Sequence, residues 1–163
     1  MGTRSITRFF DGDTELVRVY RQYDGYPEGM GVDLAKLCDV TITNGIGMDS
    51  YKVSGDKKVR IRQEVNGMSE LAALVIMGLK QDNLVGNIYI ESCAGEISAW
   101  AEYVYSVRGK EGEKPIIICN THTDPVGTSI FNPKDKDDVV FWGNAKQWLR
   151  KYAPKKNKAK VAA

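Results

Sequence analysis

The residues best suited to chemistry lie in one twelve-residue segment, YRQYDGYPEGMG, which runs from Tyr20 to Gly31. The segment contains three tyrosines, one arginine, one aspartate and three glycines. Because it leaves a predicted strand and enters a predicted helix, it should offer free backbone N–H groups and the positive end of a helix dipole. That combination suits an anionic ligand.

The side chains of this loop favour a nucleotide as the ligand. An arginine binds phosphate or carboxylate through two parallel hydrogen bonds, and this role is predicted for Arg21. Tyrosine rings stack on nucleobases, and glycines let a backbone approach a ligand closely. The predicted ligand-binding residues are Arg4, Arg21, Tyr23, Asp24, Gly25, Tyr26, Gly29 and Gly31.

A purely structural role for the loop is the alternative. The third glycine of the dinucleotide-binding fingerprint is missing after Gly29-Met30-Gly31, and the chain has no Gly-Lys-Ser/Thr phosphate-binding loop. In the structural interpretation, Asp24-Gly25 and Pro27 make tight turns while the tyrosines pack on the sheet. The sequence leaves both roles open.

Arg4 joins the predicted site through a hairpin. Asp11-Gly12-Asp13 is a turn pattern between two strand-like segments, residues 5–10 and 15–23. Equal counting from the turn places Arg4 opposite Tyr20 to Tyr23, so we expect it to complete the Arg21 site. A register slip of one residue would undo this expectation, because it moves a side chain to the other face. The alternative is a solvated surface arginine.

Catalytic residues cannot be assigned from the sequence. His122 is the only histidine, and with Asp24 and Glu28 it provides the groups that a small metal-dependent hydrolase or nuclease would use. Cys93 or Cys119 could form a nucleophile–base pair with His122, but no spacing requires it. No metal or cofactor is predicted, and the pattern favours binding over catalysis.

The elements that must position these residues predict an α+β fold. The strongest helical pattern covers about residues 67–80 after Asn66, and its apolar residues surround most of the helix, which predicts a buried central helix. A short helix from about Glu28 or Val32 to Cys38 follows the loop, and Asn144 caps a last helix that ends at Tyr152. We expect a mostly antiparallel sheet with further strands at residues 86–91, 101–107, 115–120 and 126–131, and a hairpin or irregular excursion at 51–65.

Charge is unevenly distributed along the chain. Six basic residues and no acidic ones lie between Arg150 and the C-terminus, so the chain's net charge of +2 becomes −4 for the preceding part. We expect one domain over residues 1–153 and a flexible basic tail over 154–163, which could make weak contacts with nucleic acid. An acidic body argues against a dedicated duplex-binding protein. Because the sequence predicts neither a signal peptide nor a membrane span, we expect a cytoplasmic protein.

Three motifs carry a resemblance: Gly2-Thr3-Arg4-Ser5, the YRQYDGYP segment that starts at Tyr20, and Asn44-Gly45-Ile46-Gly47. They resemble a family of small phage and bacterial proteins that has no established activity. The resemblance implies a bacterial cytoplasm, the host's if the protein is phage-encoded, and a role that acts on host signalling or defence. It implies no mechanism.

The preferred hypothesis is non-catalytic binding of a nucleotide or another phosphate-bearing ligand. One alternative is the metal-dependent hydrolase or nuclease described above. The other is a protein–protein inhibitor that uses a tyrosine-rich surface. Tyr103 and Tyr105 share one face of a predicted strand, where they either pack across the sheet or form a stacking platform.

Overall fold

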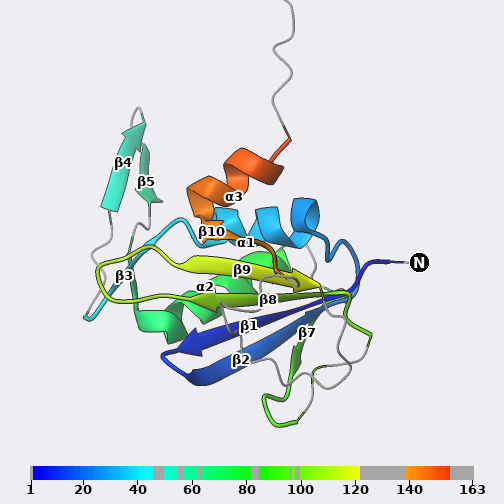
Figure 1. Cartoon of the computed structure of the whole chain (residues 1–163). Helices are drawn as coiled ribbons and strands as arrows, with labels where there is room; N and C mark the ends of the chain where they lie inside the picture. The colour runs from blue at the N-terminus through cyan, green and yellow to red at the C-terminus, as the bar shows by residue number, and fades with distance from the viewer. Residues whose placement is uncertain are drawn as a thin grey trace, which may run out of the picture.

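The computed structural model describes residues 2–45, 50–54, 57–61, 64–81, 85–95, 97, 100–121 and 139–154, and within them the fold is α+β (Figure 1). A six-stranded sheet has the order β10-β9-β8-β1-β2-β7. The β1–β8 pair is parallel and the other pairs of this sheet are antiparallel. Its strands are β1 (Ser5–Asp11), β2 (Thr14–Arg21), β7 (Ile88–Glu91), β8 (Tyr103–Arg108), β9 (Ile116–Thr121) and β10 (Val139–Asn144). The predicted fold class is confirmed.

The β1–β2 hairpin forms where the sequence predicts it. Gly12 occupies the turn with a φ of +56°, a conformation that glycine adopts without steric cost. Ser5 pairs with Arg21 at one end of the hairpin and Asp11 pairs with Thr14 at the other, with an irregularity between Phe9 and Phe10.

Helix α2 (Gly67–Gln81) packs on β1 and β2 and covers one face of the sheet (Figure 1). Its buried residues recur at helical spacing and are Met68, Leu71, Ala72, Val75 and Leu79. The central helix is confirmed, but it is buried on one face and not around its circumference, since Met77 is 68% exposed. The apolar residues on its outer side are therefore not all part of the core.

The short helix α1 (Val32–Leu37), the π-helical turn η1 (Pro27–Gly31) and the last helix α3 (Ala145–Tyr152) pack against one another. Asn144 caps α3 as predicted, because its side chain accepts a hydrogen bond from the Gln147 backbone while the Gln147 side chain accepts one from the Asn144 backbone. Trp148 is fully buried, and its indole N–H donates to the Ile117 carbonyl oxygen. Pro27, at the start of η1, needs no backbone donor there.

Shorter strands lie outside the main sheet. Strand β3 (Thr41–Thr43) pairs in parallel with β6 (Glu64–Asn66), and β4 (Ser50–Ser54) pairs with β5 (Lys57–Ile61) as the hairpin that the 51–65 segment predicts. The sequence did not predict β10. The strand predicted at 126–131 and the tail from residue 155 onward lie outside the described residues.

Tyr103 and Tyr105 were expected either to pack or to form a stacking platform. Tyr105 is fully buried in the main core and Tyr103 packs against that core, so the packing alternative holds for this pair. Among the residues described, no helix has both the length and the hydropathy needed to cross a membrane.

Candidate functional site

Arg21, the central residue of the predicted loop site, is nearly buried and hydrogen-bonded on several sides. Its guanidinium donates to Asp33 Oδ2 at 2.8 Å and to the Tyr23 carbonyl oxygen at 2.7 Å, and it contacts Met30 Sδ at 3.3 Å. Only 6% of the residue is exposed. Arg21 therefore holds the start of the loop against η1 and α1.

The three glycines of the loop are positions of close packing. A Cβ atom on Gly25 would lie 2.7 Å from the Arg4 backbone carbon, and one on Gly29 would lie 2.4 Å from the Asp24 carbonyl oxygen. A Cβ on Gly31 would lie 2.4 Å from the Trp148 ring. Each glycine is therefore required by neighbouring protein atoms. The close approach predicted at these glycines is therefore made by other residues of the same protein, and not by a ligand.

Asp24 adopts a left-handed conformation with a φ of +57°, which costs energy for a residue other than glycine. Its backbone carbonyl accepts a hydrogen bond from the Met30 N–H at 2.9 Å, which stabilises the turn. Its carboxylate raises the pKa of the Tyr26 hydroxyl, which lies 3.3 Å from Asp24 Oδ1. Tyr23 and Tyr26 are exposed, so these rings are the accessible part of the loop.

The expectation that Arg4 completes the Arg21 site is wrong. The hairpin register was predicted correctly, but Ser5 is the residue opposite Arg21. Adjacent residues of a strand point to opposite faces of the sheet, so Arg4 and Arg21 lie on different faces. The Arg4 guanidinium lies 5.8 Å from the centre of the Trp100 ring instead.

Among the described residues, the groups considered for catalysis form no metal-binding cluster. His122 lies outside the described residues, and the described residues contain no group of three or more His, Cys, Asp or Glu side chains able to hold a metal ion. Burial raises the pKa values of the Cys38 and Cys119 thiols to about 12. These thiols are therefore protonated and poorly nucleophilic at neutral pH.

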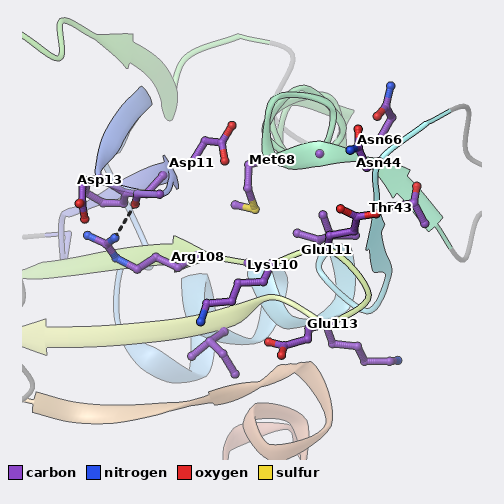
Figure 2. Close-up of a pocket in the computed structure, with 17 residues that line it drawn as sticks. Asp11, Asp13, Thr43, Asn44, Asn66, Met68, Arg108, Lys110, Glu111 and Glu113 are labelled. Carbon is purple, nitrogen blue, oxygen red and sulfur yellow. Dashed lines mark hydrogen bonds between the residues drawn. The ribbon is translucent and has the colours of Figure 1, made fainter.

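A pocket that the sequence did not predict lies at the opposite end of the sheet from the loop. The β1–β2 turn, the β8–β9 connection, β3 and the start of α2 surround a cavity of about 710 Å³ (Figure 2). It is lined by residues 10–13, 42–44, 66–68, 108–111, 113, 114 and 116. This cavity, called the turn pocket below, collects polar and charged side chains from four separate segments.

Backbone hydrogen bonds build the wall of the turn pocket. The Ile42 N–H donates to the Glu113 carbonyl oxygen at 3.0 Å, and the Gly112 N–H donates to the Ile42 carbonyl oxygen at 2.8 Å. These bonds attach β3 to the β8–β9 connection. At the start of α2, the Asn66 N–H donates to the Glu70 carboxylate, and the Asn66 side chain accepts from the Gly45 N–H.

Arg108 is the most unusual charged group of the turn pocket. Its Nη1 donates to the Gly12 carbonyl oxygen at 2.9 Å, and its guanidinium lies 4.0 Å from the centre of the Phe10 ring. Its Nε is buried without a hydrogen-bond partner. Burial lowers the pKa of the Arg108 guanidinium, with Asp13 opposing and Arg8 adding to the shift, but an arginine stays protonated in a protein.

The cations of the pocket differ in whether they are already paired. Lys114 forms an ion pair with Asp39. Within the described part of the chain, Arg108 and Lys110 form no ion pair. Figure 2 shows the Lys110 side chain in the middle of the group of pocket residues, between Arg108 and Glu111. Two charged donors are therefore available to a ligand.

Comparisons of the chain with protein-family models, with curated proteins and with solved structures found no match. What the turn pocket binds must therefore be inferred from its own side chains. Three turn patterns in the sequence mark segments that line the turn pocket: Asp11-Gly12-Asp13, Asn66-Gly67 and Gly109-Lys110-Glu111-Gly112. Each pattern predicts a local turn, and none shows that the three turns meet.

Proposed function

We propose that this protein binds a nucleotide or another phosphate-bearing ligand without chemically converting it, and that the ligand occupies the turn pocket. The observation that carries the proposal is the pair of cations, Arg108 and Lys110, that line the cavity without an ion-pair partner among the described residues. A phosphate group would accept hydrogen bonds from both side chains.

Burial and helix orientation support an anion at this position. Arg108 is partly desolvated and stacked on Phe10, so an ion pair made there is screened less than one on an open surface. Gly67 and Met68, in the first turn of the 15-residue helix α2, also line the cavity. The partial positive charge of a helix N-terminus favours an anion nearby, although the Glu70 carboxylate already offsets part of it.

The size of the cavity supports a ligand larger than phosphate alone. Small-molecule pockets usually measure about 300–1,000 Å³, and the turn pocket has a volume of about 710 Å³. In the phage context that the sequence resemblance implies, a non-catalytic binder would act by sequestering a host nucleotide used in signalling or defence.

A thermal-shift screen tests the proposal. Wild type is tested against inorganic phosphate, mononucleotides and cyclic dinucleotides, beside Lys110→Ala and a control, Lys146→Ala, on the exposed side of α3. A ligand that binds the folded state raises the melting temperature. We expect a shift in wild type and in the control, and a much smaller shift in Lys110→Ala. If no phosphate-bearing compound shifts the wild type, the proposal fails.

The same samples test the non-catalytic part of the proposal. The bound nucleotide is incubated with the protein and Mg²⁺ or Mn²⁺ and then analysed by chromatography. We expect it to be recovered unchanged. Hydrolysed product that depends on the protein would favour the hydrolase or nuclease alternative instead.

A second candidate function, binding of a protein partner, is favoured by a surface on the sheet face opposite α2. This surface, called the aromatic surface, consists of Arg4, Tyr20, Tyr89 and Trp100. The Tyr20 and Tyr89 ring centres lie 6.1 Å apart, and Trp100 is 72% exposed. Tyrosine, tryptophan and arginine are the residue types most enriched at interaction hot spots. A Trp100→Ala variant that captures the same host proteins as wild type would count against this candidate.

A further inference from the structure

We infer that the protein forms a symmetric dimer in which the β7 strands of two copies pair antiparallel to each other, centred on Ile90. The pairing involves a different part of the molecule from the turn pocket and goes beyond the proposed function. β7 is the last strand of the six-stranded sheet, beside β2, and no strand of the described residues pairs with its outer edge (Figure 1). The unpaired backbone groups of an edge strand can pair with another chain.

The register of β7 on β2 determines which backbone groups point to the outer edge. The Gln22 N–H donates to the Asn87 carbonyl oxygen at 2.9 Å, in register with the β2–β7 pairs. Because hydrogen-bonded and non-hydrogen-bonded pairs alternate in an antiparallel ladder, Tyr89 directs its N–H and C=O toward β2. Ile88 and Ile90 direct theirs away from β2, to the outer edge.

The outward groups of Ile88 are already used within the chain. Its N–H donates to the Gly86 carbonyl oxygen at 2.7 Å, and its carbonyl oxygen accepts a hydrogen bond from Lys80 Nζ at 3.4 Å. Within the described part of the chain, the outward N–H and C=O of Ile90 have no such partner. Ile90 is therefore the residue of β7 that offers both a donor and an acceptor at the edge.

Symmetry limits the registers in which two β7 strands can pair. Residues opposite each other in an antiparallel pair point to the same face of the sheet, and neighbours along a strand point to opposite faces. In a twofold dimer, one residue must therefore lie opposite itself. A register centred on Tyr89 would need the outward groups of Ile88, which are occupied. A register centred on Ile90 needs only the groups of Ile90, which form two hydrogen bonds across the axis.

The side chains at this edge also match a second copy. Ile90 lies opposite Val19, on the face that α2 covers, yet it is 67% exposed. In the dimer, the two Ile90 side chains meet at the axis and are removed from water. β7 has the sequence Ile-Tyr-Ile-Glu, and it lacks the lysine or proline that commonly prevents edge strands from pairing.

The opposite face of the sheet provides polar and aromatic contacts for the same register. Tyr89 is 47% exposed, and in the dimer it lies opposite Glu91 of the second copy, whose carboxylate can accept a hydrogen bond from the tyrosine hydroxyl. The two Tyr89 rings are diagonal neighbours, a spacing within reach of aromatic side chains. The Tyr20–Tyr89 ring pair of each copy then continues across the axis. The dimer therefore brings both aromatic surfaces together on one face of a continuous sheet.

Sedimentation equilibrium of wild type, Ile90→Lys and Val85→Lys from micromolar to millimolar concentration tests the dimer. We expect the average mass of wild type to rise with concentration from 18.1 kDa toward twice that value. Ile90→Lys should keep the monomer mass throughout, because two lysines would meet at the axis. Val85 is 94% exposed and lies outside β7, so Val85→Lys is the matched control and should dimerise like wild type. Equal urea denaturation curves of the two variants check that both are folded.

Disulfide cross-linking tests the register. In a Cys93→Ser background, which removes a partly exposed thiol, Ile90→Cys is compared with Tyr89→Cys under mild oxidation. Opposite residues of a hydrogen-bonded pair have Cα atoms about 5.5 Å apart, which a disulfide can span, whereas diagonal residues are about 7–8 Å apart. We expect a covalent dimer for Ile90→Cys and at least about tenfold slower cross-linking for Tyr89→Cys.

Three results would overturn the inference. A wild type that stays at the monomer mass at every concentration would exclude the dimer and leave the β7 edge to another kind of partner. A dimer that persists in Ile90→Lys would place the interface elsewhere. Faster cross-linking of Tyr89→Cys than of Ile90→Cys would exclude the register centred on Ile90. Ligand binding in the turn pocket is tested by other variants, so either proposal can fail without the other.

Discussion

The two ends of the central sheet contain similar residue types but use them differently. At the loop end, Arg21 is buried and bonded to Asp33 and to a backbone carbonyl. At the pocket end, Arg108 and Lys110 line a cavity without an ion-pair partner among the described residues. An arginine in a distinctive motif can thus serve the fold, while candidate binding groups come together from segments that carry no distinctive motif.

The positive-φ turn glycines of the pocket end also differ from the glycines of the loop end. At the loop end, a Cβ on Gly25 or Gly29 would collide with backbone atoms. At the pocket end, Gly12, Gly67 and Gly112 have positive φ angles, and an added Cβ would meet nothing within 4 Å. The first group is needed for packing, and the second group is needed for turns beside open space. Substitutions at each end test this difference.

The largest effect is expected for Gly25→Ala at the loop end. Its Cβ would lie 2.7 Å from the Arg4 carbonyl carbon and 2.8 Å from the Ser5 nitrogen, and neither backbone atom can move cheaply. We expect a loss of about 3 kcal/mol in the free energy of unfolding, measured by urea denaturation. A fully stable Gly25→Ala variant would show that the loop end is not packed as described.

Arg21→Ala should have the next largest effect. The substitution leaves the Tyr23 carbonyl oxygen and the half-exposed Asp33 carboxylate without their donor, and we expect a loss of about 2 kcal/mol in unfolding free energy. Lys36→Ala is the matched control, since Lys36 is an exposed partner of the same Asp33 at 3.8 Å and should matter little. Nucleotide affinity should change in neither variant. A large loss of nucleotide affinity in Arg21→Ala would indicate that the ligand binds at the loop and not in the turn pocket.

A smaller, pH-dependent effect is expected for Glu15→Gln, beside the β1–β2 turn. Burial alone would raise the pKa of the Glu15 carboxyl, but hydrogen bonds and charges from Arg18 and Arg8 together lower it below its usual 4.5. A carboxyl group with a lowered folded-state pKa stabilises the fold above its unfolded-state pKa and loses that effect as pH falls. We expect wild type to exceed Glu15→Gln by about 1–2 kcal/mol at neutral pH.

The difference between wild type and Glu15→Gln should shrink as the pH falls below about 4.5, the usual value of this group. Chemical denaturation at several pH values measures it. A difference that stays constant from neutral to strongly acidic pH would show that the charge of Glu15 does not stabilise the Arg8–Arg18 cluster.

The smallest stability effect is expected for Lys110→Ala at the pocket end. Lys110 is exposed and its side chain makes no hydrogen bond or ion pair in the described structure, so the unfolding free energy should change by less than about 0.5 kcal/mol. Ligand affinity should nevertheless fall. A strongly destabilised Lys110→Ala variant would mean that this lysine serves the fold and not a ligand.

Local patterns predicted most of the fold. The Asp11-Gly12-Asp13 turn predicted the hairpin and its register, the apolar run after Asn66 predicted α2, and Asn144 predicted the cap of α3. These features depend on neighbouring residues. They are therefore readable from a single sequence.

The candidate site could not be predicted in the same way. The turn pocket exists because β1 pairs in parallel with β8, which brings Arg108 to Gly12 across 96 residues of chain. No local pattern specifies that pairing. The prediction that Arg4 completes the Arg21 site was wrong although the hairpin register was right. A shift of one residue along a strand reverses the face to which a side chain points.

The most direct test of the central claim compares the backbone amides of both ends during one titration. In an isotope-labelled sample, the amide signals of Gly12, Gly67 and Gly109 report on the turn pocket, and those of Gly25 and Gly29 report on the loop. On addition of the phosphate-bearing compound that raises the melting temperature most, we predict saturable shifts of the first group and unchanged signals of the second. Saturable shifts confined to Gly25 and Gly29, or no shifts at either end, would rule out binding at the turn pocket.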